Sequence, residues 1–339
     1  MAIKFFDLDP AKQDRYRLIA FEREHGILEL LKGATRCLQL VSNFSVYSLE
    51  SPIAGQPDPI ELPAKYFVTE WLDDDIDEYF LDQESHTAVN KLKIFNEVVL
   101  ALEGLHFRKV FHRDLKPDNF RRRQSEIASE IVAIDLGTAA RYESPPIAPS
   151  YGAPVGFLMY SAPEAFCGLA GSREVAPLTD MFALGCMLFE LFHPDDYPSA
   201  YRATNPDFDV RFSALQTRID PTADDATKIQ QWDDEADRLF IGLAKVSLSG
   251  GGSSAPMAVA DHLTDLVSSM TAPNFRHRCT SFSKVRERCW VAIRVLESVA
   301  ISKRRAEQAG AKRAARQAKA IARAKRASML NFGFCLEGG

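Results

Sequence analysis

The fold is decided by the stretch FHRDLKPDNF at residues 111–120, which brings an Asp, a Lys and an Asn together in one loop-like segment. Three further runs follow in order: AIDLG at 133–137, SAPEAF at 161–166 and TDMFALGCMLFEL at 179–191. Alone, each run is typical of an ordinary turn or helix, since Asp, Asn and Pro are common in turns. All four runs in this order, however, indicate a particular fold far more specifically than any one run does.

The four runs resemble the catalytic loop, magnesium loop, Pro-Glu segment and buried-Asp helix of the eukaryotic-type protein kinases, in their Ser/Thr branch. The resemblance covers roughly residues 1–300. It implies an α+β, two-lobed protein-kinase-like fold with an incomplete small β lobe and a mostly α-helical large lobe. We expect the small lobe and hinge at residues 1–72, the large lobe at 73–300, and a basic, Ala-rich helical tail at 301–339.

The resemblance assigns the chemistry to four residues. Asp114 would accept or orient the proton of a substrate hydroxyl, and Lys116 would stabilise charge on the phosphoryl group. Asn119 and Asp135 offer hard oxygen ligands that would hold Mg²⁺ against the phosphates of ATP. Phosphoryl transfer depends mainly on positioning and charge neutralisation. The implied function is therefore a kinase that moves the γ-phosphate of ATP to Ser/Thr hydroxyls of protein substrates.

The first residues, MAIK, resemble the family's V-A-I-K strand, whose Lys contacts the α- and β-phosphates. Lys4 would be that lysine, and Glu24 would be the helix glutamate that holds it. The alternative for Lys4 is a solvated lysine at a frayed end. In the family a Gly-rich loop lies before this strand, so the resemblance implies a chain truncated ahead of it. The run GGGSS at 250–254 is more typical of a flexible surface loop.

The segment YFVTEWLDDD at 66–75 resembles the last small-lobe strand and the hinge. Thr69 would lie at the back of the adenine pocket. The backbones of Glu70 and Leu72 would hydrogen-bond the adenine edge. Backbone bonds leave no side-chain pattern, so these positions follow from the resemblance alone.

Further residues of the resemblance are structural. Glu164 would form a buried ion pair with Arg278 or, as the second choice, Arg276. Asp180 would cap the backbone of the catalytic loop. Arg113 would pair with a phosphate on the activation segment, for which the sequence offers three acceptors without choosing among them: Ser144, Ser150 and Tyr151.

The missing Gly-rich loop and two departures from the family pattern favour a second hypothesis. Phe157 replaces the Thr of the Ser/Thr branch, whose hydroxyl would tie the activation segment to Asp114 and Lys116, and Arg121 replaces the apolar residue beneath adenine. A third departure, Leu136 in place of a Phe, is still apolar and should cost little. The alternative function is thus a pseudokinase or kinase-fold scaffold that binds partners without phosphoryl transfer. A small-molecule kinase of related fold is a third, weaker possibility, because the full HRDLKPDN run favours protein substrates.

Hydrophobic periodicity predicts helices at 17–32, 87–107, 179–192, 263–270 and 283–299, β-strands at 37–49 and 65–71, and a short buried strand ending in a turn at 131–137. We expect a loop at 51–63. The polar, Asp-rich stretch 202–238 and the segment 249–256 are expected to be surface insertions.

Composition places the chain among ordinary globular proteins, with 339 residues, 46% hydrophobic residues and a net charge of −5. Its six cysteines show no metal-ligand spacing, which favours free thiols in a reducing compartment. The longest apolar run, at 181–192, is too short to cross a bilayer. No signal-peptide pattern is visible at the start, and we expect a cytoplasmic protein without a membrane span.

The tail is the one strongly charged feature. Residues 301–339 hold ten basic and two acidic residues, so the tail carries about +8 and the rest of the chain about −13. Within 303–326, six cations recur on one helical face: Arg305, Lys312, Arg316, Lys319, Arg323 and Arg326. They predict an anionic partner, or else a solvated helix. Candidate partners are anionic lipid, the chain's own acidic patch Asp73–Asp75, and nucleic acid, which is disfavoured but not excluded because no aromatic residues are interleaved.

Overall fold

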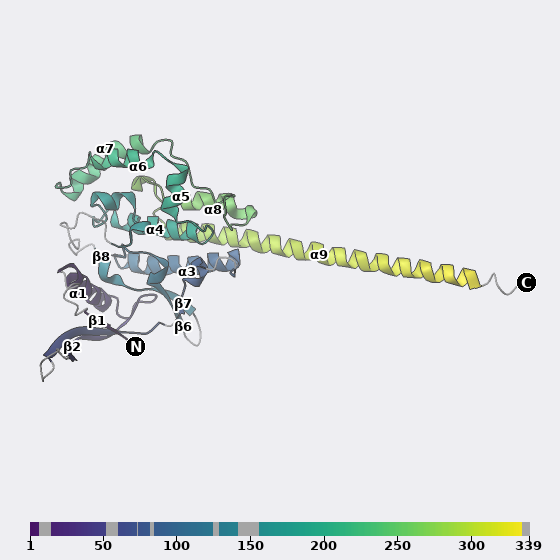
Figure 1. The fold of residues 1–339 in the computed structure, drawn as a ribbon, viewed down its shortest axis with the longest axis horizontal. Coiled ribbons are helices and arrows are strands. Elements are labelled where there is room, and N and C mark those ends of the chain that lie inside the picture. The colour runs from purple at the N-terminus through teal and green to yellow at the C-terminus, as the bar shows by residue number, and fades with distance from the viewer. Residues whose placement is uncertain are drawn as a thin grey trace, which may run out of the picture.

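A sheet-containing small lobe lies against a larger helical lobe, and one long helix extends far beyond both (Figure 1). The computed structural model describes residues 1–6, 15–51, 60–72, 74–81, 85–124, 129–141 and 156–333. Asp73, Cys335 and the three candidate activation-segment acceptors lie outside the described residues. The arrangement agrees with the two-lobed, α+β kinase-like fold that the sequence predicts.

The small lobe is a three-stranded antiparallel sheet covered by one helix. Strands β1 (Ala2–Phe5), β2 (Leu40–Ser51) and β3 (Ile60–Thr69) pair in the order β1-β3-β2. Helix α1 (Arg15–Leu30) buries Phe21, Ile27 and Leu28 against the sheet, and the chain leaves the helix through Gly33 at φ +74°. The predicted helix and strands are confirmed. The predicted loop is shorter than expected, because β3 already begins at Ile60.

Two small sheets support the catalytic loop. Strands β4 (Asp74–Asp75), β6 (Phe120–Gln124) and β7 (Ser129–Ala133) form one, in the order β4-β6-β7. Strands β5 (Val110–Phe111) and β8 (Ala140–Arg141) form the other. The catalytic loop leaves β5 and enters β6, so both of its ends are fixed by strand pairing.

Helices α3 (Ala88–Phe107) and α4 (Ala176–Glu190) form the centre of the large lobe. The Thr87 hydroxyl caps α3 by accepting a hydrogen bond from the Asn90 N–H. Most residues of α4 are buried, as its nearly continuous apolar sequence predicts. Short helix α2 (Glu78–Leu81) precedes α3, and α8 (Met257–Met270) packs against α4.

The Asp-rich stretch 202–238 was expected to be a surface insertion, and this expectation is wrong. It belongs to α5 (Tyr197–Thr204), α6 (Phe208–Gln216) and α7 (Asp225–Phe240). These helices are amphipathic, and Trp232 on their inner side is fully buried. Several of the aspartates are on the outer faces or cap helices, as Asp224 does for α7. The polar composition of this segment therefore obscured the apolar faces of helices that contribute to the core.

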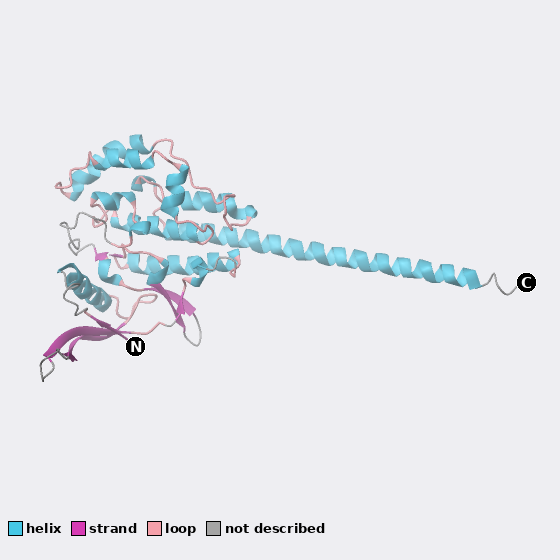
Figure 2. Ribbon diagram, viewed as in Figure 1, coloured by secondary structure: helices cyan, strands magenta, loops and turns pink. Residues whose placement is uncertain are grey.

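The C-terminal helix α9 runs from Phe282 to Gly333 without a break (Figure 2). The sequence predicted two helices here, but no Pro interrupts the segment between them. The first part of α9 packs on α3 and α8, whereas residues 297–324 are all exposed. Within the described residues, five cysteines are free thiols, and none of the helices combines the length and the hydrophobicity that a bilayer span requires. The cytoplasmic location stays a prediction.

Replacing Gly185 with Ala is expected to destabilise the large lobe by about 1–3 kcal/mol, because the new methyl group overpacks the contact between α4 and α8. A Cβ at this position would lie 2.5 Å from Thr271 Cγ2 and 2.8 Å from Met270 Cβ. Urea denaturation followed by circular dichroism measures the loss. The matched control is Gly26→Ala in α1, which meets no atom within 4 Å and should be neutral or slightly stabilising. Equal urea midpoints for Gly185→Ala and Gly26→Ala would contradict this account of the α4–α8 contact.

Candidate active site

Asp180 of α4 holds the start of the catalytic loop. Its carboxylate accepts hydrogen bonds from the backbone N–H groups of His112 and Arg113, both at 2.8 Å, and contacts His106 Nε2 at 2.7 Å. Burial alone would raise the pKa of Asp180, but the contact with His106 and the backbone bonds hold it below its usual value. The predicted capping role of Asp180 is confirmed. It also stabilises the left-handed backbone of Arg113, at φ 67°.

Asp114 is oriented from two sides. Asn119 donates through Nδ2 to the Asp114 carbonyl at 2.7 Å and lies 3.4 Å from its Oδ2. The backbone N–H of Phe157 donates to Asp114 Oδ1 at 2.6 Å. The sequence suggested that replacing Thr with Phe157 costs a link between the activation segment and this Asp. The backbone supplies a link instead, and Gly156 permits it at φ +87°, where a Cβ would lie 2.7 Å from the Arg113 carbonyl oxygen.

Lys4, Glu24 and Asp135 come together from β1, α1 and the loop after β7. Lys4 Nζ lies 2.5 Å from Glu24 Oε2 and 2.9 Å from Asp135 Oδ1. Burial would lower the pKa of Lys4, but the two carboxylates outweigh burial and raise it. Burial raises the pKa of Glu24, which is 2% exposed, whereas Lys4 holds the pKa of Asp135 below its usual value against the effect of burial. The cluster therefore keeps a charged lysine beside an ionised aspartate.

Asn119 and Asp135, the predicted Mg²⁺ ligands, are drawn together by the backbone. The Ile134 N–H, one residue before Asp135, donates to the Asn119 carbonyl at 2.9 Å. Asn119 uses its amide nitrogen on Asp114, which leaves its side-chain oxygen as a ligand. Among the described residues, no group of three or more His, Cys, Asp or Glu could hold a metal. This sparse oxygen set fits Mg²⁺, which keeps waters and substrate phosphates in its coordination shell.

The hinge is fixed by contacts that the sequence did not indicate. The Glu70 N–H donates to the Gln39 carbonyl at 3.0 Å, so only the carbonyl of Glu70 can face adenine. Its side chain pairs with Arg123, and Arg123 also donates to the Cys37 carbonyl at 2.8 Å. Thr69 is buried where the back of the adenine pocket was expected. Arg123 lies in the run RRR at 121–123, where the sequence cannot show which arginine turns inward.

Truncating Arg123 to Ala is expected to cost about 1–3 kcal/mol of stability, because the half-buried Glu70 carboxylate loses its charged donor. The hinge should also loosen, which weakens ATP binding. Thermal unfolding with and without Mg-ATP measures both effects. The control is Arg122→Ala on the same strand, expected to stay within about 0.5 kcal/mol. If the two variants unfold alike, the hinge network does not hold the lobes together.

The remaining predicted residues surround this centre. Lys116 Nζ lies 3.2 Å from Asp118 Oδ2. Arg121 reaches Asp75 at 4.0 Å, and Leu72 packs on the core beside the hinge. Burial lowers the pKa of Arg113 to about 10, and Nε and Nη1 of its guanidinium have no hydrogen-bond partner. Its predicted partner, a phosphate on the activation segment, falls outside the described residues.

The predicted ion pair of Glu164 is confirmed, and its partner is Arg278. Two guanidinium nitrogens of Arg278 bind the two carboxylate oxygens, and both side chains are fully buried. Arg278 also donates to the Ala272 carbonyl at 2.7 Å and the Leu178 carbonyl at 3.1 Å. Arg276, the second candidate, pairs with Asp233 and Glu174 near the surface instead.

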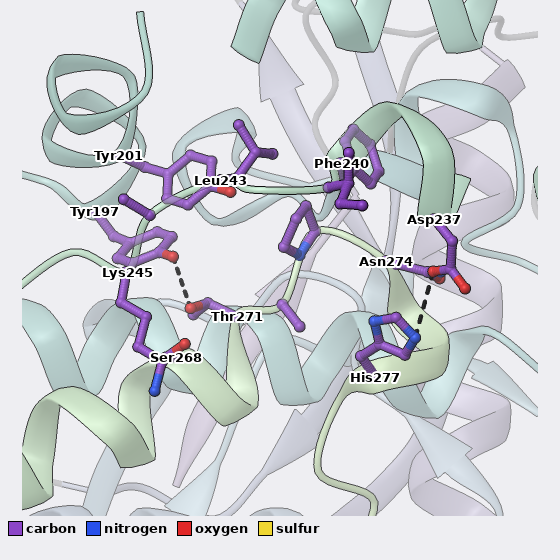
Figure 3. Close-up of a pocket in the computed structure, with 14 residues that line it drawn as sticks. Tyr197, Tyr201, Asp237, Phe240, Leu243, Lys245, Ser268, Thr271, Asn274 and His277 are labelled. Atoms are coloured by element: carbon purple, nitrogen blue, oxygen red, sulfur yellow. Dashed lines mark hydrogen bonds and ion pairs between the residues drawn. The ribbon is translucent and has the colours of Figure 1, made fainter. Parts of the chain in front are cut away.

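Two pockets of about 320 Å³ lie in the large lobe. One lies between α5, the end of α7 and the segment after α8, where Tyr197 bonds Thr271 at 2.7 Å and Asp237 lies 3.3 Å from His277 (Figure 3). It shares no residue with the catalytic set. The other adjoins the catalytic loop and includes Lys116 in its wall. Of these two pockets, the second is the one that lies beside the loop carrying Asp114.

Comparisons with known proteins agree with this geometry. The family model described as "Protein kinase domain" matches residues 1–291. Serine/threonine-protein kinase PSK2 of Saccharomyces cerevisiae is 28% identical over 161 residues, 48% of this chain and 12% of that protein. Serine/threonine-protein kinase ksp1 of Schizosaccharomyces pombe is 34% identical over 133 residues, 37% of this chain and 27% of that protein.

A longer match is to cell division control protein 2 homolog 2 of Trypanosoma brucei brucei, 25% identical over 216 residues. It covers 63% of this chain and 58% of the relative, so less than two thirds of each of these relatives is matched. The family model, in contrast, spans most of the chain, including Lys4, Asp114 and Asp135. The chain therefore belongs to the eukaryotic-type protein kinase family.

Proposed function

We propose that this chain is an active, Mg²⁺-dependent protein kinase that transfers the γ-phosphate of ATP to Ser/Thr hydroxyls of proteins. The observation that carries the proposal is the position of Lys4 between Glu24 and Asp135, at 2.5 and 2.9 Å. This arrangement holds a cation where phosphates would meet the metal ligand.

We assign a separate role in the reaction to each residue of the site. Asp114 takes the proton of the substrate hydroxyl as the oxygen–phosphorus bond forms and the bond to ADP breaks. Lys116 offsets negative charge on the transferred group, and Lys4 positions the ATP phosphates. Asn119 and Asp135 would hold Mg²⁺, which neutralises phosphate charge when it is bound.

Two residues at the hinge would receive the adenine. The Glu70 carbonyl and the backbone of Leu72 are the groups we assign to its edge, behind which Thr69 lies buried. Preference for Ser/Thr over Tyr is supported by Lys116, two residues after Asp114, and by the printed names of two relatives.

The competing function is a kinase-fold scaffold without phosphoryl transfer. It is favoured by Arg121, whose cation faces Asp75 where an apolar residue would cover adenine. A scaffold would give no Mg-ATP-dependent stabilisation. An enzyme should be stabilised at saturating nucleotide by about 2.7 kcal/mol at 100 times Kd.

Replacing Lys4 with Met should lower Mg-ATP-dependent phosphorylation of a degenerate Ser/Thr peptide library by about 100-fold or more, because a charged donor to the phosphates is lost. Radiolabel transfer from ATP, with and without EDTA, measures the change. Lys65→Met is the matched control, because Lys65 forms a similar 2.8 Å ion pair with Glu22 of α1 away from Asp135. Wild-type chain without Mg²⁺-dependent transfer, or equal loss in both variants, would refute the enzyme proposal.

A further inference from the structure

We propose that Ser328 in the tail of one copy is a substrate of the active site of another copy. The inference rests on the proposed kinase activity and names a substrate for it. It joins three independent features: an acidic pocket beside Lys116, an apolar groove next to it, and the sequence around Ser328. It also identifies the anionic partner predicted for the basic tail.

The pocket beside Lys116 is acidic. Its wall contains five carboxylates: Asp77, Asp118, Glu190, Asp195 and Asp196. Lys116 contributes one cation, but Asp118 already pairs with it at 3.2 Å. The apolar side chains of Phe80 and Leu81 complete the wall. Such a pocket fits the charged head of a Lys or Arg together with its aliphatic stem.

Carboxylates outnumber basic side chains in the wall of this pocket, where Lys116 and His193 face five acidic residues. Asp77 Oδ1 is buried without a hydrogen-bond partner. Burial, and then the neighbouring Asp118 and Asp75, raise the pKa of Asp77. Burial raises the pKa of Glu190 to about 7, although the Tyr160 hydroxyl hydrogen-bonds to it. A bound cation would relieve this crowding of negative charge.

An apolar groove of about 280 Å³ borders the same segment of chain. Residues 157–161 contribute Phe157 and Tyr160 to the acidic pocket, and Leu158, Met159 and Ser161 to the groove. Aromatic rings from other elements complete the groove, among them Phe166, Phe208 and Phe212. The backbone of Phe157 is bonded to Asp114, so both sites adjoin the catalytic aspartate. The geometry favours a substrate in which basic residues lie on one side of the acceptor Ser or Thr and apolar residues on the other side.

The tail contains this pattern in RAKRASML at 323–330. Lys325 and Arg326 come three and two residues before Ser328, and Met329 and Leu330 follow it. In an extended chain, three residues span about 10 Å, which is the scale of neighbouring subsites. The body of the chain, at about −13, also attracts a tail of about +8 over a long range.

Ser125 is the competing acceptor, because RRR at 121–123 precedes it. Two properties disfavour it. Glu126 follows Ser125, and a carboxylate does not suit an apolar groove. Arg123 is already bound to Glu70 and Glu130 within the fold.

The reaction must occur between copies. Helix α9 is exposed from Glu297 to Ala324 and points away from both lobes (Figure 1). From Glu297 to Ser328 the helix rises about 46 Å, which carries the serine away from its own catalytic loop. Helix ends open at little free-energy cost, and neighbouring cations such as Lys312 and Arg316 repel one another. The end of α9 can therefore extend into a second molecule's site.

The transfer is a simple displacement. Ser328 Oγ forms a bond to the γ-phosphorus of ATP while the bond to the bridging oxygen breaks, and ADP leaves with that electron pair. The hydroxyl proton passes to Asp114 of the copy that acts as enzyme. The phosphate adds a charge of about −1.5 to −2 beside Lys325 and Arg326. This charge weakens attraction to the acidic pocket and releases the product.

The first test incubates the 339-residue chain with Mg-ATP at several concentrations and locates phosphate by mass spectrometry. We expect phosphate at Ser328, with an initial rate per molecule that rises with chain concentration. Ser328→Ala should lower total incorporation at least about 10-fold, whereas Ser302→Ala on the same helix should not change it. Phosphate at Ser125 but not Ser328, or a rate per molecule independent of concentration, overturns the proposal.

The second test separates this inference from the proposed function. A synthetic peptide of residues 320–333 should be phosphorylated with a kcat/KM about 10-fold higher than its double variant Lys325→Ala, Arg326→Ala. Asp195→Asn in the enzyme should bring the ratio of the two kcat/KM values, peptide over double variant, closer to one. Asp209→Asn on α6 should leave this ratio unchanged. If the degenerate library is phosphorylated but the ratio is near one, only the Ser328 proposal fails. If neither library nor peptide is phosphorylated, the kinase proposal fails with it.

Discussion

Asp114→Ala is expected to lower kcat by about 10²–10⁴-fold, the range usual for loss of a positioned general base. The carboxylate is oriented by Phe157 N–H at 2.6 Å, and Asn119 is bonded to the same residue. Removing the side chain leaves the substrate hydroxyl without an acceptor for its proton. Steady-state phosphorylation of the peptide library measures the loss.

The conservative variant Asp114→Asn is the control for positioning. An Asn side-chain oxygen can still accept the hydrogen bond from Phe157, so the activation segment should keep its link to the loop. Both variants should keep their thermal shift with Mg-ATP, because Lys4 and Asp135 are untouched. Activity close to wild type in either variant would mean that Asp114 is not the base. Loss of the thermal shift as well would point to collapse of the loop instead.

The residues near Asp114 could be predicted because they lie in one continuous run that resembles the family's catalytic loop. Asp114, Lys116 and Asn119 all belong to HRDLKPDN, so one motif assigns all three. Lys4 and Glu24 were harder, since one is on a strand and the other on a helix. They were predicted because MAIK resembles the family's V-A-I-K strand and Glu24 its helix glutamate, and the ion pair at 2.5 Å agrees with that resemblance.

Backbone contacts could not be predicted. The Phe157 N–H replaces a missing hydroxyl, and the Glu70 N–H is occupied by Gln39, yet any residue type has an N–H. The pairing of Arg123 with Glu70 depends on which side of β6 faces the hinge. A run of three arginines has no polarity pattern to decide this.

Helices with polar surfaces were misjudged for a related reason. In α7, Trp232 and Phe240 are buried on one side while aspartates cover the other. Average polarity over the segment suggested an insertion, whereas its helical period predicts a buried face. In α9 both helical segments were predicted, but with a break between them, because the apolar pattern ends near residue 299 while helix propensity continues into the tail.

The largest expected loss of stability is for Glu164→Ala, at about 3–5 kcal/mol, because it leaves the Arg278 guanidinium charged and fully buried. Arg278 retains hydrogen bonds to three carbonyls, those of Ala272, Leu178 and Pro273, but loses both carboxylate oxygens. Urea denaturation followed by circular dichroism measures the change. The surface control is Arg276→Ala, whose partners are partly exposed and which should cost about 1 kcal/mol or less.

A double replacement tests whether the cost comes from the unpaired charge. Glu164→Met with Arg278→Met removes both charges and fills much of the same volume, so it should lose less stability than Glu164→Ala alone. A double variant at least as unstable as the single one would mean that the bonds from Arg278 to the Ala272 and Leu178 carbonyls, rather than the ion pair, hold this part of the lobe. Arg278 would then act mainly as a clamp between the segment after α8 and α4. Glu164 would in that case serve chiefly to neutralise the arginine.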